Sequence, residues 1–148
     1  MNGHSSALFL LVSLAFGALA PAQMIQYCTV TAAGESCGPQ LTITIVPHGN
    51  GGNYDLTMQA TGLHPHAHGG FIWGDTPQSL ILDGGGCLSL CDYVWGHYFQ
   101  TDNAGTYTFS RTWPHWAIGY YYMQMGSMTV ANNDLSVRTT NCKLVQCY

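Results

Sequence analysis

Alternation of apolar and polar residues is the feature of this sequence that most restricts its fold. Leu41, Ile43 and Ile45 are separated by threonines, and the same period of two recurs over residues 54–61. A period of two places the apolar residues on one face of a β-strand, whereas a helix needs a period of about 3.6. Residues 48–53, rich in glycine and asparagine, lie between the two segments and are typical of a turn. The sequence therefore predicts a β-hairpin here.

Six further segments have strand character, and each is bounded by glycine, proline, asparagine or aspartate. They are residues 70–73, 79–82, 93–100, 106–112, 119–125 and 135–140. Residues 101–105 and 131–134 are expected to be turns, and no stretch after residue 22 shows a helical period. A total of about eight short strands predicts an antiparallel β-sandwich, with an up-and-down β-barrel as the alternative.

The chain begins with a segment that is typical of export signals. Residues 7–20 are almost entirely apolar, and the small residues of Ala20-Pro21-Ala22 fit a signal cleavage site. The apolar run is shorter than the roughly 20 residues that a transmembrane helix needs. We predict a signal peptide over residues 1–22, one domain over residues 23–148, and a mature protein that is secreted or held at the cell surface without membrane insertion. An uncleaved anchor is the alternative.

Charged residues are scarce in this chain. Three Lys or Arg and seven Asp or Glu give a net charge of −4 at neutral pH. Such a chain has no basic surface for nucleic acid and no cationic run for an anionic membrane. Weak electrostatic repulsion between copies favours self-association through sheet edges or aromatic faces.

All six cysteines follow the predicted cleavage site: Cys28, Cys37, Cys87, Cys91, Cys142 and Cys147. An even number in an exported chain predicts three disulfides rather than a thiolate zinc site, which needs reduced sulfur. Their grouping along the sequence favours the local pairs Cys28–Cys37, Cys87–Cys91 and Cys142–Cys147. A bridge between the two ends of the domain, Cys28–Cys142, is the main alternative.

The densest cluster of potential metal ligands is His64-Pro65-His66-Ala67-His68. In an extended segment alternate residues share a face, so two imidazoles could converge on one Zn²⁺ or Cu²⁺ ion. The proline and the neighbouring glycines fit equally with a polar loop that holds no metal. The sequence predicts no obligatory cofactor and leaves copper or zinc at His64, His66 and His68 as the alternative.

Aromatic residues form the second candidate site. In the segment Trp113-Pro-His-Trp116, the proline interrupts a strand pattern and indicates an exposed loop. In a strand over residues 119–125, Tyr120 and Tyr122 share one face, and Tyr121 shares the other face with Met123. Tyrosine and tryptophan supply large contact areas with a polar tip. Most of the aromatic residues are expected to fill the core and the sheet edges, and contact of a glycan or a neighbouring subunit with Trp113, Trp116, Tyr120 and Tyr122 is the alternative.

Several short motifs follow one another in a distinctive order between Tyr54 and Thr140. They are Ala60-Thr-Gly-Leu63 at a strand end, the short strand Gly70-Phe-Ile-Trp-Gly74, the segment Gly86-Cys-Leu88, the turn Thr101-Asp-Asn-Ala-Gly105, the strand Gly119-Tyr-Tyr-Tyr-Met-Gln124, and the closing Asn133-Asp-Leu-Ser-Val137. This order resembles the small exported β-sandwich domains of many secreted planctomycete-type bacterial proteins. The resemblance implies export and the sandwich fold, and it brings no established activity. The histidines after Leu63 and the additional Cys91 depart from the family pattern.

Motifs for catalysis are missing from the sequence. It contains no Gly-x-Ser-x-Gly nucleophile motif, and the candidate carboxylates occupy turn-like settings, namely Asp75, Asp83, Asp92 and Asp102. We therefore predict an exported, non-catalytic structural or adhesive surface module that associates with itself. A metal-binding or carbohydrate-binding module is the alternative, and a secreted enzyme is the third hypothesis.

Overall fold

The computed structural model describes residues 28–33, 38–48, 53–75, 77–81, 87–91, 95–114 and 119–148, and these form an all-β fold. The predicted signal peptide lies outside these ranges. The strands in chain order are β1 (Cys28–Ala32), β2 (Gln40–His48), β3 (Asn53–Thr61), β4 (His68–Gly74), β5 (Pro77–Ile81), β6 (Cys87–Cys91), β7 (Trp95–Gln100), β8 (Tyr107–Trp113), β9 (Gly119–Ala131), β10 (Asp134–Thr139) and β11 (Lys143–Cys147).

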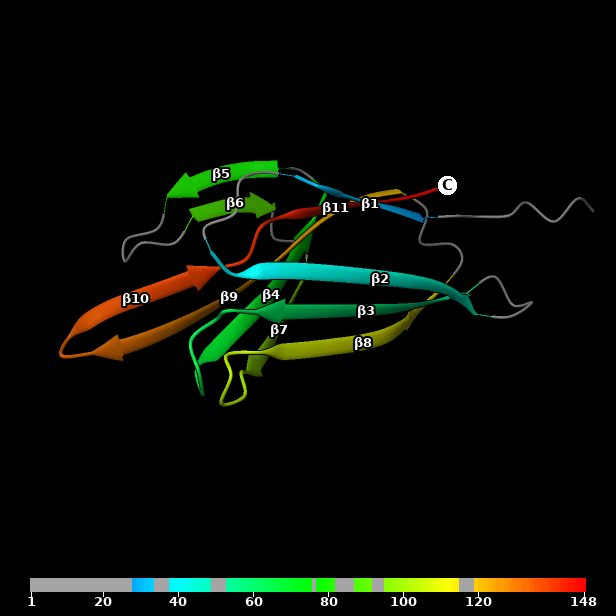
Figure 1. The fold of residues 1–148 in the computed structure, drawn as a ribbon. Helices are drawn as coiled ribbons and strands as arrows, with labels where there is room; N and C mark the ends of the chain where they lie inside the picture. The colour runs from blue at the N-terminus through cyan, green and yellow to red at the C-terminus, as the bar shows by residue number, and fades with distance from the viewer. Residues whose placement is uncertain are drawn as a thin grey trace, which may run out of the picture.

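Sheet A has six strands and is built around the long strand β9. The first half of β9 pairs with β11, and its second half pairs with β10. On the opposite edge of β9 lies β4, which also pairs with β7, and β1 pairs with β11. Sheet B has the strand order β2-β3-β8, and β5 and β6 form a separate hairpin. The strands of sheet B cross in front of β4 and β9 in Figure 1.

The core lies between sheet A and sheet B. Every second residue of β3 is buried, namely Tyr54, Leu56, Met58 and Ala60. The buried residues that sheet A contributes to the same cluster include Phe71, Phe99, Met123, Met125 and Val145. Because an alternating strand buries one face, two such sheets packed against each other make a sandwich. The predicted antiparallel β-sandwich is therefore confirmed. The barrel alternative is wrong, because sheet B is open, with β2 and β8 at its edges.

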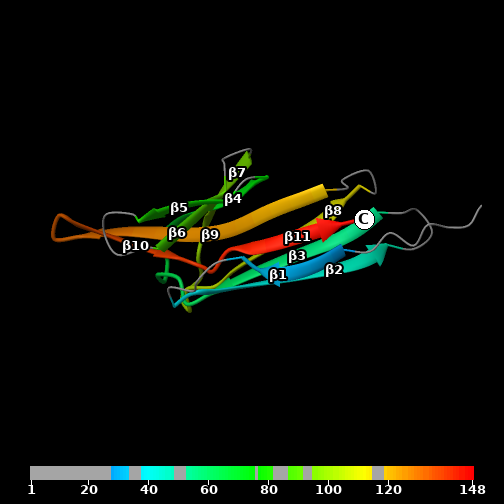
Figure 2. The same ribbon diagram turned by 90° about the horizontal axis from the view of Figure 1, so that it is seen from above.

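The hairpin of β9 and β10 projects beyond the end of sheet B (Figures 1 and 2). Its turn residues Asn132 and Asn133 have φ angles of 54° and 65°. A two-residue type I′ turn requires this left-handed conformation at both positions, and asparagine tolerates it. The predicted turn over residues 131–134 is thus confirmed. Three apolar side chains of the hairpin, Met128, Val130 and Leu135, lie on the face of sheet A that points away from sheet B, and they are exposed.

The disulfide that the structure shows joins the two ends of the domain. Cys28 and Cys147 are bonded to each other across 119 positions of sequence. The predicted pairs Cys28–Cys37 and Cys142–Cys147 are therefore wrong, and so is the alternative Cys28–Cys142. The physical reason is the antiparallel pairing of β1 with β11, which sets Cys28 directly opposite Cys147.

The third local pair, Cys87–Cys91, conflicts with the strand that contains it. These two cysteines begin and end β6. Four residue steps in an extended strand separate two Cα atoms by about 13 Å, whereas a disulfide requires less than about 7 Å. Among the remaining cysteines, Cys142 is buried, and Cys37 lies outside the described residues. In the described part of the chain, the structure thus shows one disulfide where three local ones were expected.

Candidate functional site

The segment that carries the three adjacent histidines is a turn rather than an extended strand. His66 has a φ angle of 51°, in the left-handed region. The segment is held against the turn of residues 101–105 by backbone hydrogen bonds. The N–H of Leu63 donates to the carbonyl of Gly105, and the N–H of His66 donates to the carbonyl of Asp102, each at 3.0 Å. The metal hypothesis assumed an extended segment in which alternate histidines share one face. The turn does not have this arrangement.

Two side chains of the neighbouring turn fix this geometry. The hydroxyl of Thr101 donates to the carbonyl of His64 at 2.6 Å and accepts the N–H of Ala67 at 2.8 Å. The Oδ1 of Asp102 accepts the N–H groups of Ala104 and Thr106 at 2.9 and 2.7 Å. An aspartate that binds backbone amides two and four residues ahead stabilises its own turn. The prediction that this aspartate has a structural role in a turn is confirmed.

Both ring nitrogens of His64 lie near serine hydroxyls of the projecting hairpin. Nδ1 is 3.2 Å from Oγ of Ser127, and Nε2 is 3.0 Å from Oγ of Ser136. Burial lowers the pKa of His64 below its usual value, the positive charge of Arg138 lowers it further, and the contact with Ser127 acts in the opposite direction. Burial and Arg138 thus favour the neutral imidazole, and its two ring nitrogens lie within hydrogen-bond distance of hydroxyl groups.

His68 lies on the other face of sheet A. His68 pairs with Met128 of β9. His64 contacts Ser127, the residue that precedes Met128 in the same strand. Neighbouring residues of a strand point to opposite faces, so β9 separates the side chains of His64 and His68. Within the described ranges, no group of three His, Cys, Asp or Glu side chains is placed to hold a metal ion.

Titration with metal provides a direct test of the histidine hypothesis. Because the three imidazoles do not converge, we expect Zn²⁺ to bind weakly and His66→Ala to leave its affinity unchanged. Calorimetric titration of both proteins at pH 7 measures the two affinities. A loss of about 10-fold or more in the variant would instead identify His66 as a ligand.

The predicted aromatic residues that the structure describes, Trp113, Tyr120 and Tyr122, do not gather at one surface. Trp113 is half-buried between the sheets, where its ring centroid lies 5.7 Å from that of Trp73 and 4.9 Å from that of Tyr121. The ring of Tyr121 also stacks on Trp73, at 5.2 Å. Packing of this kind makes Trp113 part of the core rather than of an exposed loop. Trp116 lies outside the described residues.

Tyr120 and Tyr122 lie on the outer face of sheet A. The alternation predicted for this strand is confirmed, because Met123 is buried and Tyr121 packs against the core. Tyr120 is exposed and Tyr122 is half-buried. Among Trp113, Tyr120 and Tyr122, the predicted contact residues that the structure describes, Tyr120 has the most exposed side chain.

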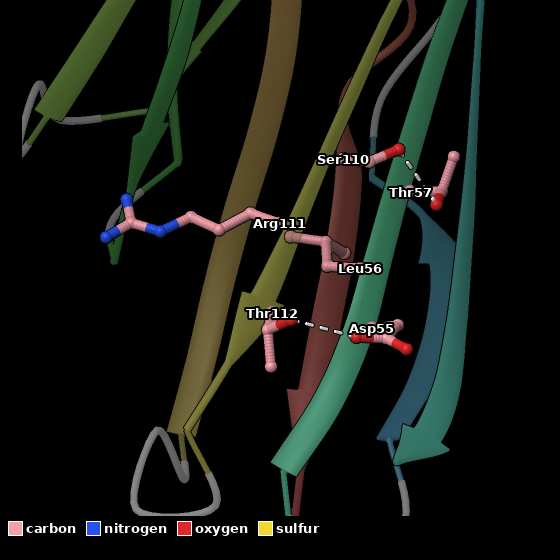
Figure 3. Close-up of a pocket in the computed structure, with 6 residues that line it drawn as sticks. All are labelled: Asp55, Leu56, Thr57, Ser110, Arg111 and Thr112. Atoms are coloured by element: carbon pink, nitrogen blue, oxygen red, sulfur yellow. Dashed lines mark hydrogen bonds between the residues drawn. The ribbon is translucent and has the colours of Figure 1, made fainter.

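A shallow depression of about 370 Å³ lies over the β3 and β8 strands of sheet B (Figure 3). The hydroxyl of Thr112 donates to Oδ1 of Asp55 at 3.0 Å, and the hydroxyls of Thr57 and Ser110 are 3.2 Å apart. Arg111 points away from these polar groups. Asp55 is the one carboxylate in the lining, whereas the usual glycosidase mechanism uses two. These hydroxyls belong to the polar outer face of sheet B. The polar residues that alternate with apolar ones along the sequence of β3 could have indicated this face.

Comparison with protein-family models, with curated proteins and with solved structures finds no match for this chain.

Proposed function

We propose that this protein is a secreted, non-catalytic structural module that works by associating with copies of itself. The observation that carries the proposal is the edge of sheet B. β2 is nine residues long, contains no Asp, Glu, Lys or Arg, and pairs with β3 along one side. A long, uncharged edge strand presents unpaired backbone groups, and such strands readily add a further strand.

The redox state of the chain supports a location outside the cell. The Cys28–Cys147 disulfide is typical of proteins that fold in an oxidising compartment. The described residues contain no helix of the length and apolarity that crossing a membrane requires. The apolar segment over residues 7–20 and the resemblance to exported sandwich domains add to this proposal.

The low net charge of the chain makes the proposed self-association dependent on pH. The sequence pI is about 5.9, so repulsion between copies is weakest near pH 6. We expect the purified, oxidised protein to form dimers or larger assemblies, most strongly near this pH and less at pH 8. Light scattering at a series of protein concentrations from pH 4 to pH 8 measures the average mass. A protein that stays monomeric at high concentration throughout this range would contradict the proposed function.

A further inference from the structure

The edge strands of the described sheets differ in their protection against pairing. β8 carries Arg111 in the core-facing row, opposite the buried Leu56, and the arginine is exposed. β10 carries the exposed Asp134 and Arg138. Charges at such positions oppose the addition of another strand. β2, at the other edge of sheet B, lacks a charge of either sign and is nine residues long, whereas the uncharged edge strands β1 and β7 of sheet A have five and six residues.

The hydrogen bond of one backbone amide shows which residues of β2 face the open edge. The N–H of Leu41 donates to Oδ1 of Asn141 at 2.8 Å, away from β3. Because the backbone groups of a strand point alternately to its two sides, Ile43 and Ile45 also direct their N–H and C=O groups to this edge. Pro47 is next in the same row and has no N–H. The donors of this row that remain for another strand are those of Ile43 and Ile45.

We propose that β2 pairs antiparallel with β2 of a second copy of this chain, across a two-fold axis at Thr44. Ile43 then lies opposite Ile45 of the second copy, and the two residues exchange N–H···O=C hydrogen bonds on both sides of the axis. Leu41 then lies opposite Pro47 of the second copy. The N–H of Leu41 is already bonded to Asn141 of its own chain, and Pro47 has no N–H. The donor pattern is complementary to itself about Thr44, which is why the partner is a second copy.

The side chains of the outer face fit the same register. Thr42, Thr44 and Val46 are exposed, and Val46 retains 52% of its accessible surface. Pairing about Thr44 sets Val46 opposite Thr42 of the second copy, which covers apolar surface without opposing like charges. In Figure 2, β2 runs along the margin of the fold. The pairing would join two three-stranded sheets into one sheet of six strands.

This inference rests on the proposed function and gives it a partner and a site. Thr44→Lys sets two ammonium groups side by side at the axis, and like charges directly opposite each other destabilise a strand pair. We expect the dissociation constant, measured by sedimentation velocity, to rise about 10-fold or more. Ser110→Lys is the matched control, because Thr44 and Ser110 both lie opposite Thr57, at the two edges of one sheet. The control should leave association unchanged.

Mixing oppositely charged variants tests the symmetry of the pair. Thr44→Lys and Thr44→Asp should each be weakened alone, because each sets its own charge against itself. An equimolar mixture should recover association as a heterodimer, because the ammonium group of one variant then faces the carboxylate of the other at the axis. No recovery in the mixture would overturn the placement of the axis.

Cysteine substitutions test the register independently of charge. Thr44 faces its copy in a non-hydrogen-bonded pair, with Cα atoms about 4.5 Å apart, which is within disulfide reach. Thr44→Cys should therefore give a disulfide-linked dimer on mild oxidation. Thr42→Cys should not, because its copy is displaced by about 13 Å along the strand. Cross-linking through Thr42→Cys but not Thr44→Cys would overturn the register.

The outcomes separate this pairing from the proposed function. A monomeric wild-type protein would contradict both. Association that Thr44→Lys weakens no more than Ser110→Lys would contradict the pairing alone, and it would point to another surface, such as the exposed Met128, Val130 and Leu135 of the projecting hairpin. Unfolding curves that coincide for the wild type and both lysine variants would show that the fold is retained.

Discussion

Replacing both Cys28 and Cys147 by alanine is expected to lower the free energy of unfolding by about 4–5 kcal/mol. The bridge closes a loop across 119 positions of sequence, and a cross-link over so long a loop removes much of the conformational entropy of the unfolded chain. It also fastens β1, an edge strand, to β11. Urea unfolding of the wild type and the double variant measures the difference.

The control for the bridge uses the adjacent residues of the same two strands. Thr29 pairs with Gln146, one position further along the β1 and β11 pairing, and these residues are not buried. Replacing both by alanine should change the free energy of unfolding by less than about 1 kcal/mol, as is usual for surface positions. If the cysteine variant were no less stable than this control, the bridge would not hold the ends of the sandwich together.

Gly69→Ala is expected to destabilise the protein by about 3 kcal/mol, a typical cost of adding volume to a packed core. A Cβ atom at this position would lie 2.5 Å from the carbonyl oxygen of Gly126 and 2.5 Å from Cε2 of Phe99. Neither neighbour moves freely, because Gly126 belongs to the central strand β9 and the ring of Phe99 stacks on Tyr107 at 4.0 Å. Thermal and urea unfolding measure the loss.

The next residue of the same strand is the matched control. A Cβ atom added to Gly70 would meet nothing within 4 Å. Gly70→Ala should therefore leave stability unchanged or raise it by a few tenths of a kcal/mol, because alanine restricts the unfolded chain. Equal losses of stability in Gly69→Ala and Gly70→Ala would show that β4 and β9 do not approach each other closely at Gly69.

The alternating segments of sheet B were predictable because their signal is local. The hairpin predicted over residues 41–47 and 54–61 is observed as β2 and β3, since each strand shows its buried face within a few residues. β9 continues beyond the predicted end at residue 125 through Gly126, which resembled a strand break in the sequence. A Cβ atom there would lie 3.2 Å from Cγ2 of Thr139, so the glycine serves close packing against β10.

Contacts between distant residues explain what the sequence did not predict. β1 and β11 are short and pair with each other from opposite ends of the domain, so proximity along the chain misdirected the cysteine pairing. The conformation of the histidine turn is likewise set by Thr101 and Asp102, more than thirty positions away from His64. The absence of charge in β2 was visible in the sequence, but the side of β2 that faces the open edge required the contact between Leu41 and Asn141.

Hydrogen–deuterium exchange at the edge of sheet B tests the central claim most directly. The amides of Ile43 and Ile45 face the open edge, and they become hydrogen-bonded only when a second copy pairs with β2. We expect their exchange to slow as protein concentration rises through the range in which the protein associates, while the amides of the β8 edge exchange at unchanged rates. Exchange at Ile43 and Ile45 that does not depend on concentration, in a protein that nevertheless associates, would contradict assembly through β2.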